Sequence, residues 1–398
     1  MNARSRRSLN PGLALLIALW VALALPALSV AQSPPASEPP RISPPPEANV
    51  APAPASETKP PDNPPPPDTT PAQAVAPPPR KGPWLALVLP LESPTYARAA
   101  TAVREGFAAA ANEAGIDFAV VSHVDGDARA AIEKAQAAGA RVIVGPLVRD
   151  DVKAIADFGG RDAPWIIALN QVEEGVAISE RVYTLALGID GEARQLARRA
   201  RQAGAQSVVV LASDSPLQKR FAEAFVSEWL LAGGGPPRQL RFDRAPELLS
   251  VIRREVGRAV PDAILLAVDA GEAAVIKPYL GKFTVYTSSQ VNDRQARENL
   301  LDLDNVFFVE IPWIADPGST TFARIARREY PNAAFDRLFA LGIDAFRVAQ
   351  VFGERGPPER LELDGATGHL SLEPSHQFSR EAMLMQFRAG AIVPAGTR

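Results

Sequence analysis

Cysteine is absent from the 398 residues of this chain, and only three histidines are present. The first absence excludes disulfide bonds, thiolate metal sites and a cysteine nucleophile, and the scarce, scattered histidines make a zinc site unexpected. The phosphate-binding patterns G-x-G-x-x-G and G-x-x-x-x-G-K-[ST] do not occur, and neither does the G-x-S-x-G of serine hydrolases. We therefore expect no catalytic residues, no metal site and no cofactor.

A strong excess of charge of one sign is also lacking. The formal net charge is −3, and the basic residues form neither a stripe nor a pattern interleaved with aromatic residues. Such patterns are typical of proteins that bind nucleic acids. We therefore expect no nucleic-acid partner.

The first 31 residues, by contrast, have a definite layout. Three arginines lie within the first seven residues, an apolar run covers 13–25, and small residues precede Gln32. This order is typical of a secretory signal peptide cut after Ala31, and the run is too short to cross a membrane as a helix. The pattern predicts export to the periplasm without a lipid-acceptor cysteine at position 32. An uncleaved signal would instead tether the protein to the inner membrane.

Residues 32–82 are rich in proline, and nineteen of the 39 prolines lie between 32 and 80. Because this segment has almost no large apolar side chains to bury against the entropy of ordering, we predict a disordered linker. Proline fixes φ and favours extended conformations, so the linker would provide reach. A tail without a role is the alternative.

From residue 83 onwards, apolar strands alternate with Ala-rich amphipathic segments. Strands are expected over 84–90, 116–122, 141–144, 165–169, 182–185, 207–212, 239–242, 263–268, 284–287 and 305–311. Helices are expected over 95–114, 127–138, 148–158, 190–203, 217–231, 246–258, 271–280, 320–329 and 335–352, and a hairpin over 368–387. Continuous apolar strands between helices are typical of parallel sheets covered on both faces. We predict one α/β domain over 83–398 with two doubly wound lobes, the first over about 83–189 plus C-terminal returns and the second over about 190–318.

In such sheets a ligand lies beyond the carboxyl ends of the strands, here in the cleft between the lobes. Hydroxyls and amides in the loops that follow the strands are therefore candidate ligand-binding groups. These candidates are Ser93, Thr95, Asn170, Gln171, Ser288, Ser289 and Gln290. The alternative role for Ser93 and Thr95 is that of a helix N-cap. The alternative for Asn170 and Gln171 is a helix cap or turn in which their side chains form local hydrogen bonds.

A further candidate lies on the long apolar helix expected over 335–352. Asp344 there should either face the cleft or pair with a neighbour such as Arg347. His123 falls at a strand end near Asp125, but no nucleophile accompanies it. A polar loop histidine is therefore expected.

Eight sequence words in order, between Trp84 and Arg388, resemble the LppC/LpoA-type family of penicillin-binding protein activators. The words are LVLPL (87–91), AVREGF (102–107), VGPL (144–147), ALNQ (168–171), YTSSQ (286–290), VEIPW (309–313), LGIDA (341–345) and GATGHLSL (365–372). The resemblance implies a type I periplasmic-binding-protein fold and a non-enzymatic regulator whose partner is a bifunctional peptidoglycan synthase. The family often has a helical-repeat N-terminal domain and a lipidated cysteine. In this chain the Pro-rich segment takes the place of that domain, and Gln32 occupies the position of that cysteine.

Other function classes remain open from the sequence. One alternative is the solute-binding protein of an ABC transporter, which would close on an amino-acid-like or amide ligand; a peptidoglycan fragment is a further candidate ligand. Such a protein usually places an acidic group opposite the hydroxyls that hold the ligand carboxylate, and the sequence offers no evident one, which favours the regulator. A periplasmic hydrolase is the third alternative.

Overall fold

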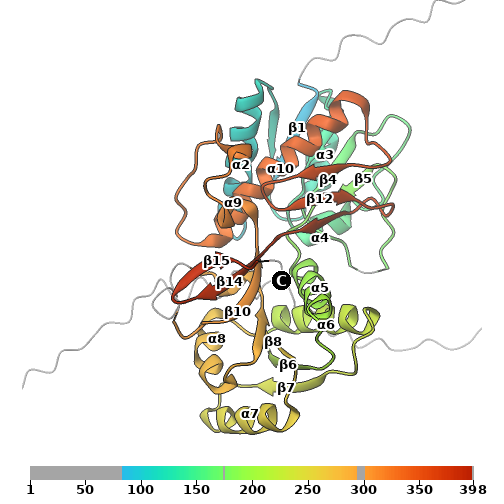
Figure 1. Cartoon of the computed structure of the whole chain (residues 1–398). Coiled ribbons are helices and arrows are strands. Elements are labelled where there is room, and N and C mark those ends of the chain that lie inside the picture. The colour runs from blue at the N-terminus through green and yellow to red at the C-terminus, as the bar shows by residue number, and fades with distance from the viewer. Residues whose placement is uncertain (1–82, 174, 294–300, 397–398) are drawn as a thin grey trace, which may run out of the picture. The chain divides into compact units, whose positions relative to one another are not determined.

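The computed structural model describes residues 83–173, 175–293 and 301–396 (Figure 1). The predicted signal peptide and the predicted Pro-rich linker lie outside the described residues. Within the described ranges, no helix combines the length and apolar character that a membrane span requires.

The first lobe is built on a five-stranded parallel sheet. Its strand order is β2-β1-β3-β4-β5, and its strands are β1 (Leu85–Leu89), β2 (Ala119–Ser122), β3 (Val142–Val144), β4 (Trp165–Ala168) and β5 (Val182–Thr184). The connecting helices are α2 (Ala97–Ala114), α3 (Ala128–Ala137) and α4 (Arg149–Ala154). Every residue of β1 and β3 is buried, because helices cover both faces of the sheet.

The second lobe repeats this arrangement. Its parallel strands β6 (Val208–Ser213), β7 (Arg238–Phe242), β8 (Ala263–Ala267), β9 (Thr284–Thr287) and β10 (Val306–Glu310) are ordered β7-β6-β8-β9-β10, the same order as in the first sheet. Helix α5 (Ile189–Gln202) precedes β6, and the helices between the strands are α6 (Pro216–Leu231), α7 (Pro246–Ala259) and α8 (Ala270–Ile276), with the 3-10 turns η1 (Lys277–Leu280) and η2 (Ser289–Val291). The predicted two-lobed, doubly wound α/β architecture is confirmed.

After β10 the chain returns to the first lobe. The short helix α9 (Pro312–Ala315) and the 3-10 turn η4 (Thr320–Phe322) lead to the long helix α10 (Ala333–Arg355). A small antiparallel sheet follows, with strands β11 (Glu362–Asp364), β12 (His369–Leu372) and β13 (Phe378–Glu381) in the order β11-β12-β13. Helix α10 lies beside α2 over the first sheet (Figure 1).

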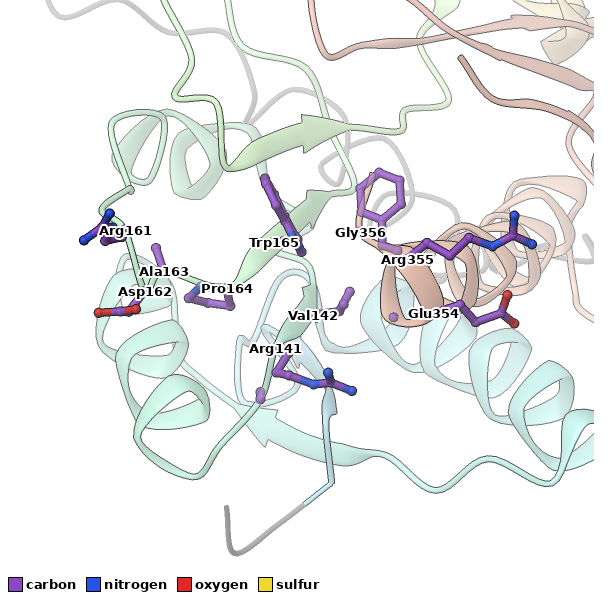
Figure 2. Close-up of a pocket in the computed structure, with 13 residues that line it drawn as sticks. Arg141, Val142, Arg161, Asp162, Ala163, Pro164, Trp165, Glu354, Arg355 and Gly356 are labelled. Atoms are coloured by element: carbon purple, nitrogen blue, oxygen red, sulfur yellow. The ribbon is translucent and has the colours of Figure 1, made fainter. Parts of the chain in front are cut away.

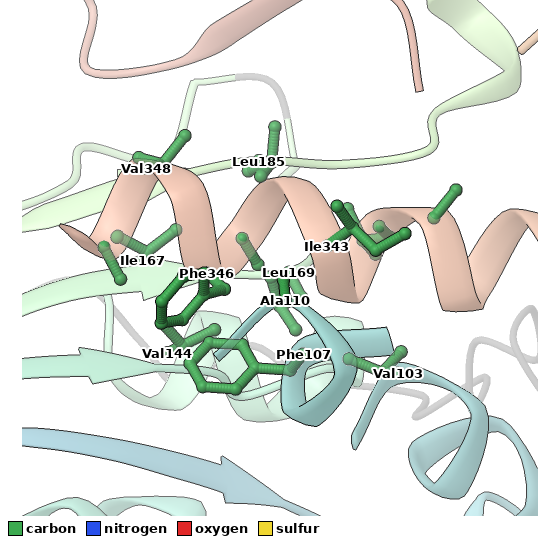
Figure 3. Packing of buried hydrophobic residues seen from close by; sticks show 14 of the residues in the cluster. Val103, Phe107, Ala110, Val144, Ile167, Leu169, Leu185, Ile343, Phe346 and Val348 are labelled. Carbon is green, nitrogen blue, oxygen red and sulfur yellow. The ribbon is translucent and has the colours of Figure 1, made fainter. Parts of the chain in front are cut away.

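Close packing of α2 on α10 forms the centre of the first core (Figure 3). A Cβ on Gly342 would overlap the carbonyl oxygen of Val103, and a Cβ on Gly106 would overlap that of Phe339, so the two backbones approach each other at these glycines. The Phe107 and Phe346 rings pack edge to face, with centroids 5.4 Å apart. The sequence of α10 therefore fixes its place on α2 through small residues as well as apolar ones.

One predicted helix is wrong. Residues 320–329 form only the 3-10 turn η4 followed by irregular chain, because just two of their side chains are anchored in the core. Phe322 and Ile325 are buried, whereas the charged residues around them leave no apolar stripe for a longer helix to bury. Arg327 instead donates a hydrogen bond to the carbonyl oxygen of Trp313 at 2.5 Å.

The predicted terminal hairpin is also only half right. Strand β13 pairs with β12, but the chain then changes sheets at Ala382, and β14 (Met383–Arg388) pairs antiparallel with β10. Strand β15 (Ala391–Pro394) pairs with β14 and forms the edge of the second sheet. The C-terminal segment therefore contributes to both lobes, whereas the sequence assigned its returns to the first lobe alone.

Candidate functional site

Charged and polar side chains meet where the second sheet reaches α10. Glu192 lies in the first turn of α5, Ser289 follows β9, and Glu310 is the last residue of β10. Arg337 lies near the amino end of α10. Together with Asn292 these four residues form what we call the interlobe network.

Hydrogen bonds connect all members of the interlobe network. The backbone N–H and the hydroxyl of Ser289 donate to the two carboxylate oxygens of Glu192 at 3.0 and 2.9 Å. Arg337 donates to both oxygens of Glu310 at 3.1 and 2.7 Å and to the carbonyl oxygen of Ser289 at 2.9 Å. Asn292 Nδ2 donates to Glu310 Oε2 at 2.8 Å. Because α10 packs in the first core, these bonds join the two lobes.

The network holds two carboxylates and one guanidinium away from water, and the guanidinium of Arg380 acts on both carboxylates from nearby. Burial raises the pKa of Glu192, and the guanidinium groups of Arg380 and Arg337 together with the Ser289 hydrogen bonds oppose that rise. Burial also disfavours the charged form of Arg337, but the ion pair with Glu310 outweighs it and raises the pKa of Arg337. The network is suited to holding the lobes in register, and its members have little hydrogen-bonding capacity left for a ligand.

Three of the predicted candidates, Ser288, Ser289 and Gln290, lie at or next to the interlobe network. Gln290 Oε1 accepts a hydrogen bond from Gln218 Nε2 at 2.8 Å, which links η2 to the first turns of α6. Ser288 Oγ and Gln218 Oε1 are buried and have no hydrogen-bond partner within the described part of the chain.

The candidates in the first lobe form local bonds instead. Asn170 Nδ2 donates to the carbonyl oxygen of Leu147 at 3.1 Å, and Asn170 Oδ1 accepts from the N–H of Gln171 at 2.9 Å. Ser93 Oγ accepts from the N–H groups of Thr95 and Tyr96 at 3.2 and 3.0 Å, in the turn that precedes α2. The N-cap of α2 is Tyr96, without a side-chain cap bond, so neither Ser93 nor Thr95 is the N-cap of this helix.

Asp344 lies within the first lobe and not at the interlobe edge. Its oxygens accept hydrogen bonds from the N–H groups of Ala366 and Thr367, both at 2.7 Å, and from the Thr367 hydroxyl at 2.6 Å. Arg347 Nη1 lies 3.8 Å away. The sequence offered the cleft as one alternative, which this placement contradicts, because α10 turns the side chain toward the loop between β11 and β12.

Groups that could perform chemistry are few. Within the described ranges, no three His, Asp or Glu side chains come together in a way that could hold a metal ion. His123 is buried, with Nδ1 2.7 Å from the carbonyl oxygen of Val124, and its Nε2 has no partner among the described residues. His369 is exposed and bonded to Asp364 and Glu362.

A cavity of about 430 Å³ lies at the opposite edge of the first sheet (Figure 2). It is formed by the segments that lead into β3 and β4 and by the last turn of α10. Its lining includes Arg141, Arg161, Trp165, Glu354 and Arg355. Sequence patterns predict no ligand at this edge, since ligands in such sheets are expected at the carboxyl ends of strands.

Sequence reasoning did not select Glu192, Glu310, Arg337 or Arg380. Nothing in their local patterns separates them from ordinary surface charges, because their burial follows from how the lobes meet. One signal was available for Glu310, which ends an otherwise apolar strand, NVFFVEI, and lies within a word shared with the family that the chain resembles. A charged residue at the end of a buried strand needs a partner.

Comparisons with known proteins give a consistent result. A family model described as "LppC putative lipoprotein" matches residues 81–236 and 248–390. The penicillin-binding protein activator LpoA of Escherichia coli (strain K12) is 26% identical over 309 residues, which cover 66% of this chain and 45% of that protein. LpoA of Glaesserella parasuis serovar 5 is 28% identical over 269 residues, which cover 66% of this chain and 46% of that protein. The chain thus spans about half the length of the curated relatives that it matches.

Solved structures share the fold. Full-length LpoA from Haemophilus influenzae has a TM-score of 0.68 at 25% identity, covering 79% of this chain and 58% of that one. The C-domain of the same protein, described as a regulator of PBP1A, has a TM-score of 0.68 at 24% identity, covering 78% and 99%. A Chromobacterium violaceum protein described as a "putative branched-chain amino acid ABC transporter" has a TM-score of 0.66 at 33% identity. The match covers 75% of this chain and 98% of that one. The predicted likeness to periplasmic binding proteins is confirmed.

Proposed function

Because the chain belongs to the LppC family, we propose that it is a non-enzymatic activator of a peptidoglycan synthase. The match to the family model over 81–236 and 248–390 is the observation that carries this proposal. The curated relatives at 26% and 28% identity are named penicillin-binding protein activators. The partner would be a bifunctional penicillin-binding protein in the periplasm, contacted through the surface of the two-lobed domain.

The interlobe network supports a regulator over a solute-binding protein. A solute binder must keep hydroxyls and an acidic group free to hold the carboxylate and the amine of its ligand. Here Glu192 is bonded to Ser289, and Glu310 is bonded to Arg337 and Asn292. An amino acid would have to replace these buried contacts, which is costly for paired charges.

The alternative is the ligand-binding component of an ABC transporter. The likeness to the Chromobacterium violaceum protein speaks for it. The family model and the curated relatives speak for the activator, and the two readings differ in what the protein should bind.

Binding to a synthase tests the proposal. The full chain is immobilised, incubated with detergent-solubilised membranes of its own organism, and washed, and the retained proteins are labelled with a fluorescent penicillin. We expect a labelled bifunctional synthase that is displaced by an excess of the free chain. No displaceable labelled protein, together with stabilisation of the chain by one amino acid in a thermal-shift screen, would contradict the proposal and support the transporter reading.

A further inference from the structure

The cavity at the amino ends of β3 and β4 has a small floor. Five buried residues border it, Ala140, Val142, Ala163, Pro164 and Phe352, whereas the ring of Trp165 is only half-buried. Its volume of about 430 Å³ lies within the range of small-molecule sites in proteins. A small apolar group of a ligand could therefore pack against the Trp165 ring here.

Trp165 is held in place at one side of this floor (Figure 2). Arg181 stacks on the indole with its guanidinium carbon 4.0 Å from the ring centroid, and Tyr183 packs edge to face at 6.2 Å. The indole is half-buried, and within the described ranges its Nε1–H has no hydrogen-bond acceptor. The cavity thus contains a fixed, free hydrogen-bond donor.

The rim of the cavity is charged. Arg141, Arg161 and Arg355 come from three separate segments of the chain, and Asp162 and Glu354 lie next to two of them. Figure 2 shows Arg141, Glu354 and Arg355 on one side and Arg161 and Asp162 on the other. In the described part of the chain, none of these five side chains forms an ion pair or a hydrogen bond with another side chain. Three guanidinium groups and two carboxylates therefore remain available to a ligand.

Two glycines keep the end of α10 bare beside the cavity. A Cβ at Gly353 would overlap the ring of Trp84, and Gly356, at φ +78°, ends the helix in a conformation that favours glycine. A Cβ at Gly356 would lie 3.8 Å from Trp165 Nε1. The absence of a side chain at Gly356 leaves the indole N–H accessible.

We propose that this cavity binds a short peptide through its free C-terminal carboxylate. The carboxylate matches the planar fork of a guanidinium and can also accept from the Trp165 N–H. A small apolar side chain of the peptide packs on the half-buried ring of Trp165, and Asp162 or Glu354 accepts from its amino group. An inorganic anion would use the arginines but neither the indole ring nor the acids. This site is separate from the interlobe network, and its occupancy does not depend on the proposed activator function.

Nuclear magnetic resonance of the full, ¹⁵N-labelled chain tests the site. The indole N–H resonance of Trp165, assigned by its loss in Trp165→Phe, is followed while tri-alanine, tri-alanine amide or inorganic phosphate is added. We expect tri-alanine to shift this resonance with saturation, and the amide and phosphate to bind at least about tenfold more weakly, which is the loss of roughly 1.4 kcal/mol. An equal response to the amide or to phosphate, or no response to tri-alanine, overturns the proposal.

Variants separate binding from folding. Arg141→Gln combined with Arg355→Gln should weaken tri-alanine binding by about tenfold or more, since each removes a charge-assisted hydrogen bond. Arg324→Gln is the matched control, because its side chain is 85% exposed and lies outside the cavity. The resonance of the buried Trp229 indole reports whether each variant remains folded. Unchanged affinity in the folded double variant also overturns the proposal.

Discussion

Arg337 and Glu310 form a bidentate ion pair between the two lobes. Arg337 Nε lies 3.1 Å from Glu310 Oε1, and Nη2 lies 2.7 Å from Oε2. Arg337 belongs to α10, which packs in the first core, and Glu310 ends β10 of the second sheet. The two side chains are 13% and 1% exposed, so the lobes are joined by a contact that water barely reaches.

Removing Arg337 should therefore be costly. Arg337→Ala leaves the Glu310 carboxylate buried without its partner, and we expect a loss of about 3–5 kcal/mol in the free energy of unfolding. Urea denaturation followed by circular dichroism measures this loss. Arg324→Ala is the control, since Arg324 is exposed and 3.7 Å from Glu113; its loss should stay within about 0.5 kcal/mol. Similar losses for both variants would contradict the assignment of a buried interlobe pair.

A glycine pair gives a second test, on the packing of α2 against α10. Gly342→Ala places a methyl group on the carbonyl oxygen of Val103, and we expect a loss of about 1–3 kcal/mol or more because the backbones must separate. Gly257→Ala in the exposed part of α7 meets nothing within 4 Å and should stabilise by about 0.4–1 kcal/mol. Thermal unfolding of both variants gives the comparison. Stabilisation by Gly342→Ala would show that the helices are not in this close contact.

The sequence predicted most of this fold because its strands and helices differ in local pattern. WLALVLP, at 84–90, is apolar without interruption, and the structure places β1 there with every residue buried. The helix predicted over 320–329 was wrong. Phe322 and Ile325 have helical spacing, but only a 3-10 turn forms there. The change of sheets at Ala382 could not be predicted, since no glycine or proline interrupts FSREAMLMQF at 378–387 and only tertiary pairing separates β13 from β14.

Thr367 should stabilise the buried carboxylate of Asp344. Its hydroxyl donates to Asp344 Oδ2 at 2.6 Å, so Thr367→Val, which keeps the shape, removes one charge-assisted bond. We expect a loss of about 1.5–3 kcal/mol in the free energy of unfolding, measured by urea denaturation. Thr321→Val is the control, because Thr321 is exposed and its hydroxyl forms no hydrogen bond among the described residues. Equal stabilities of the two variants would contradict a role for the hydroxyl.

The pKa of His369 offers a test in the small sheet. Hydrogen bonds to Asp364 and Glu362 raise the pKa of His369 above its ordinary value. A raised pKa means that this stabilising interaction is present while the imidazolium persists and is lost as pH rises through the pKa in the folded state. Proton NMR of the imidazole measures it. Asp364→Asn should lower the pKa, and Glu359→Gln, outside the cluster, should leave it unchanged; no fall in Asp364→Asn would contradict the contact.

The candidate site was harder to predict than the fold. Ser288, Ser289 and Gln290 were selected from their place after a strand, and the structure places them at the interlobe edge. Asp344, selected as a carboxylate on an apolar helix, bonds instead to the loop before β12. Glu192 and Arg337 could not be found from the sequence, because their burial depends on distant residues. Ser289 is 97 positions from Glu192, and Glu310 is 27 positions from Arg337.

The proposed activation is tested by the effect of the full chain on the synthase itself. A bifunctional penicillin-binding protein from the same organism is supplied with labelled lipid-linked precursor, and the rates of glycan polymerisation and of peptide cross-linking are measured with increasing amounts of the chain. We expect at least one rate to rise and saturate with the chain, while the chain alone leaves the precursor unchanged. Thermal stabilisation of one protein by the other shows the concentration at which binding is saturated. Unchanged rates at that concentration would contradict an activator, and turnover of the precursor by the chain alone would contradict a non-enzymatic role.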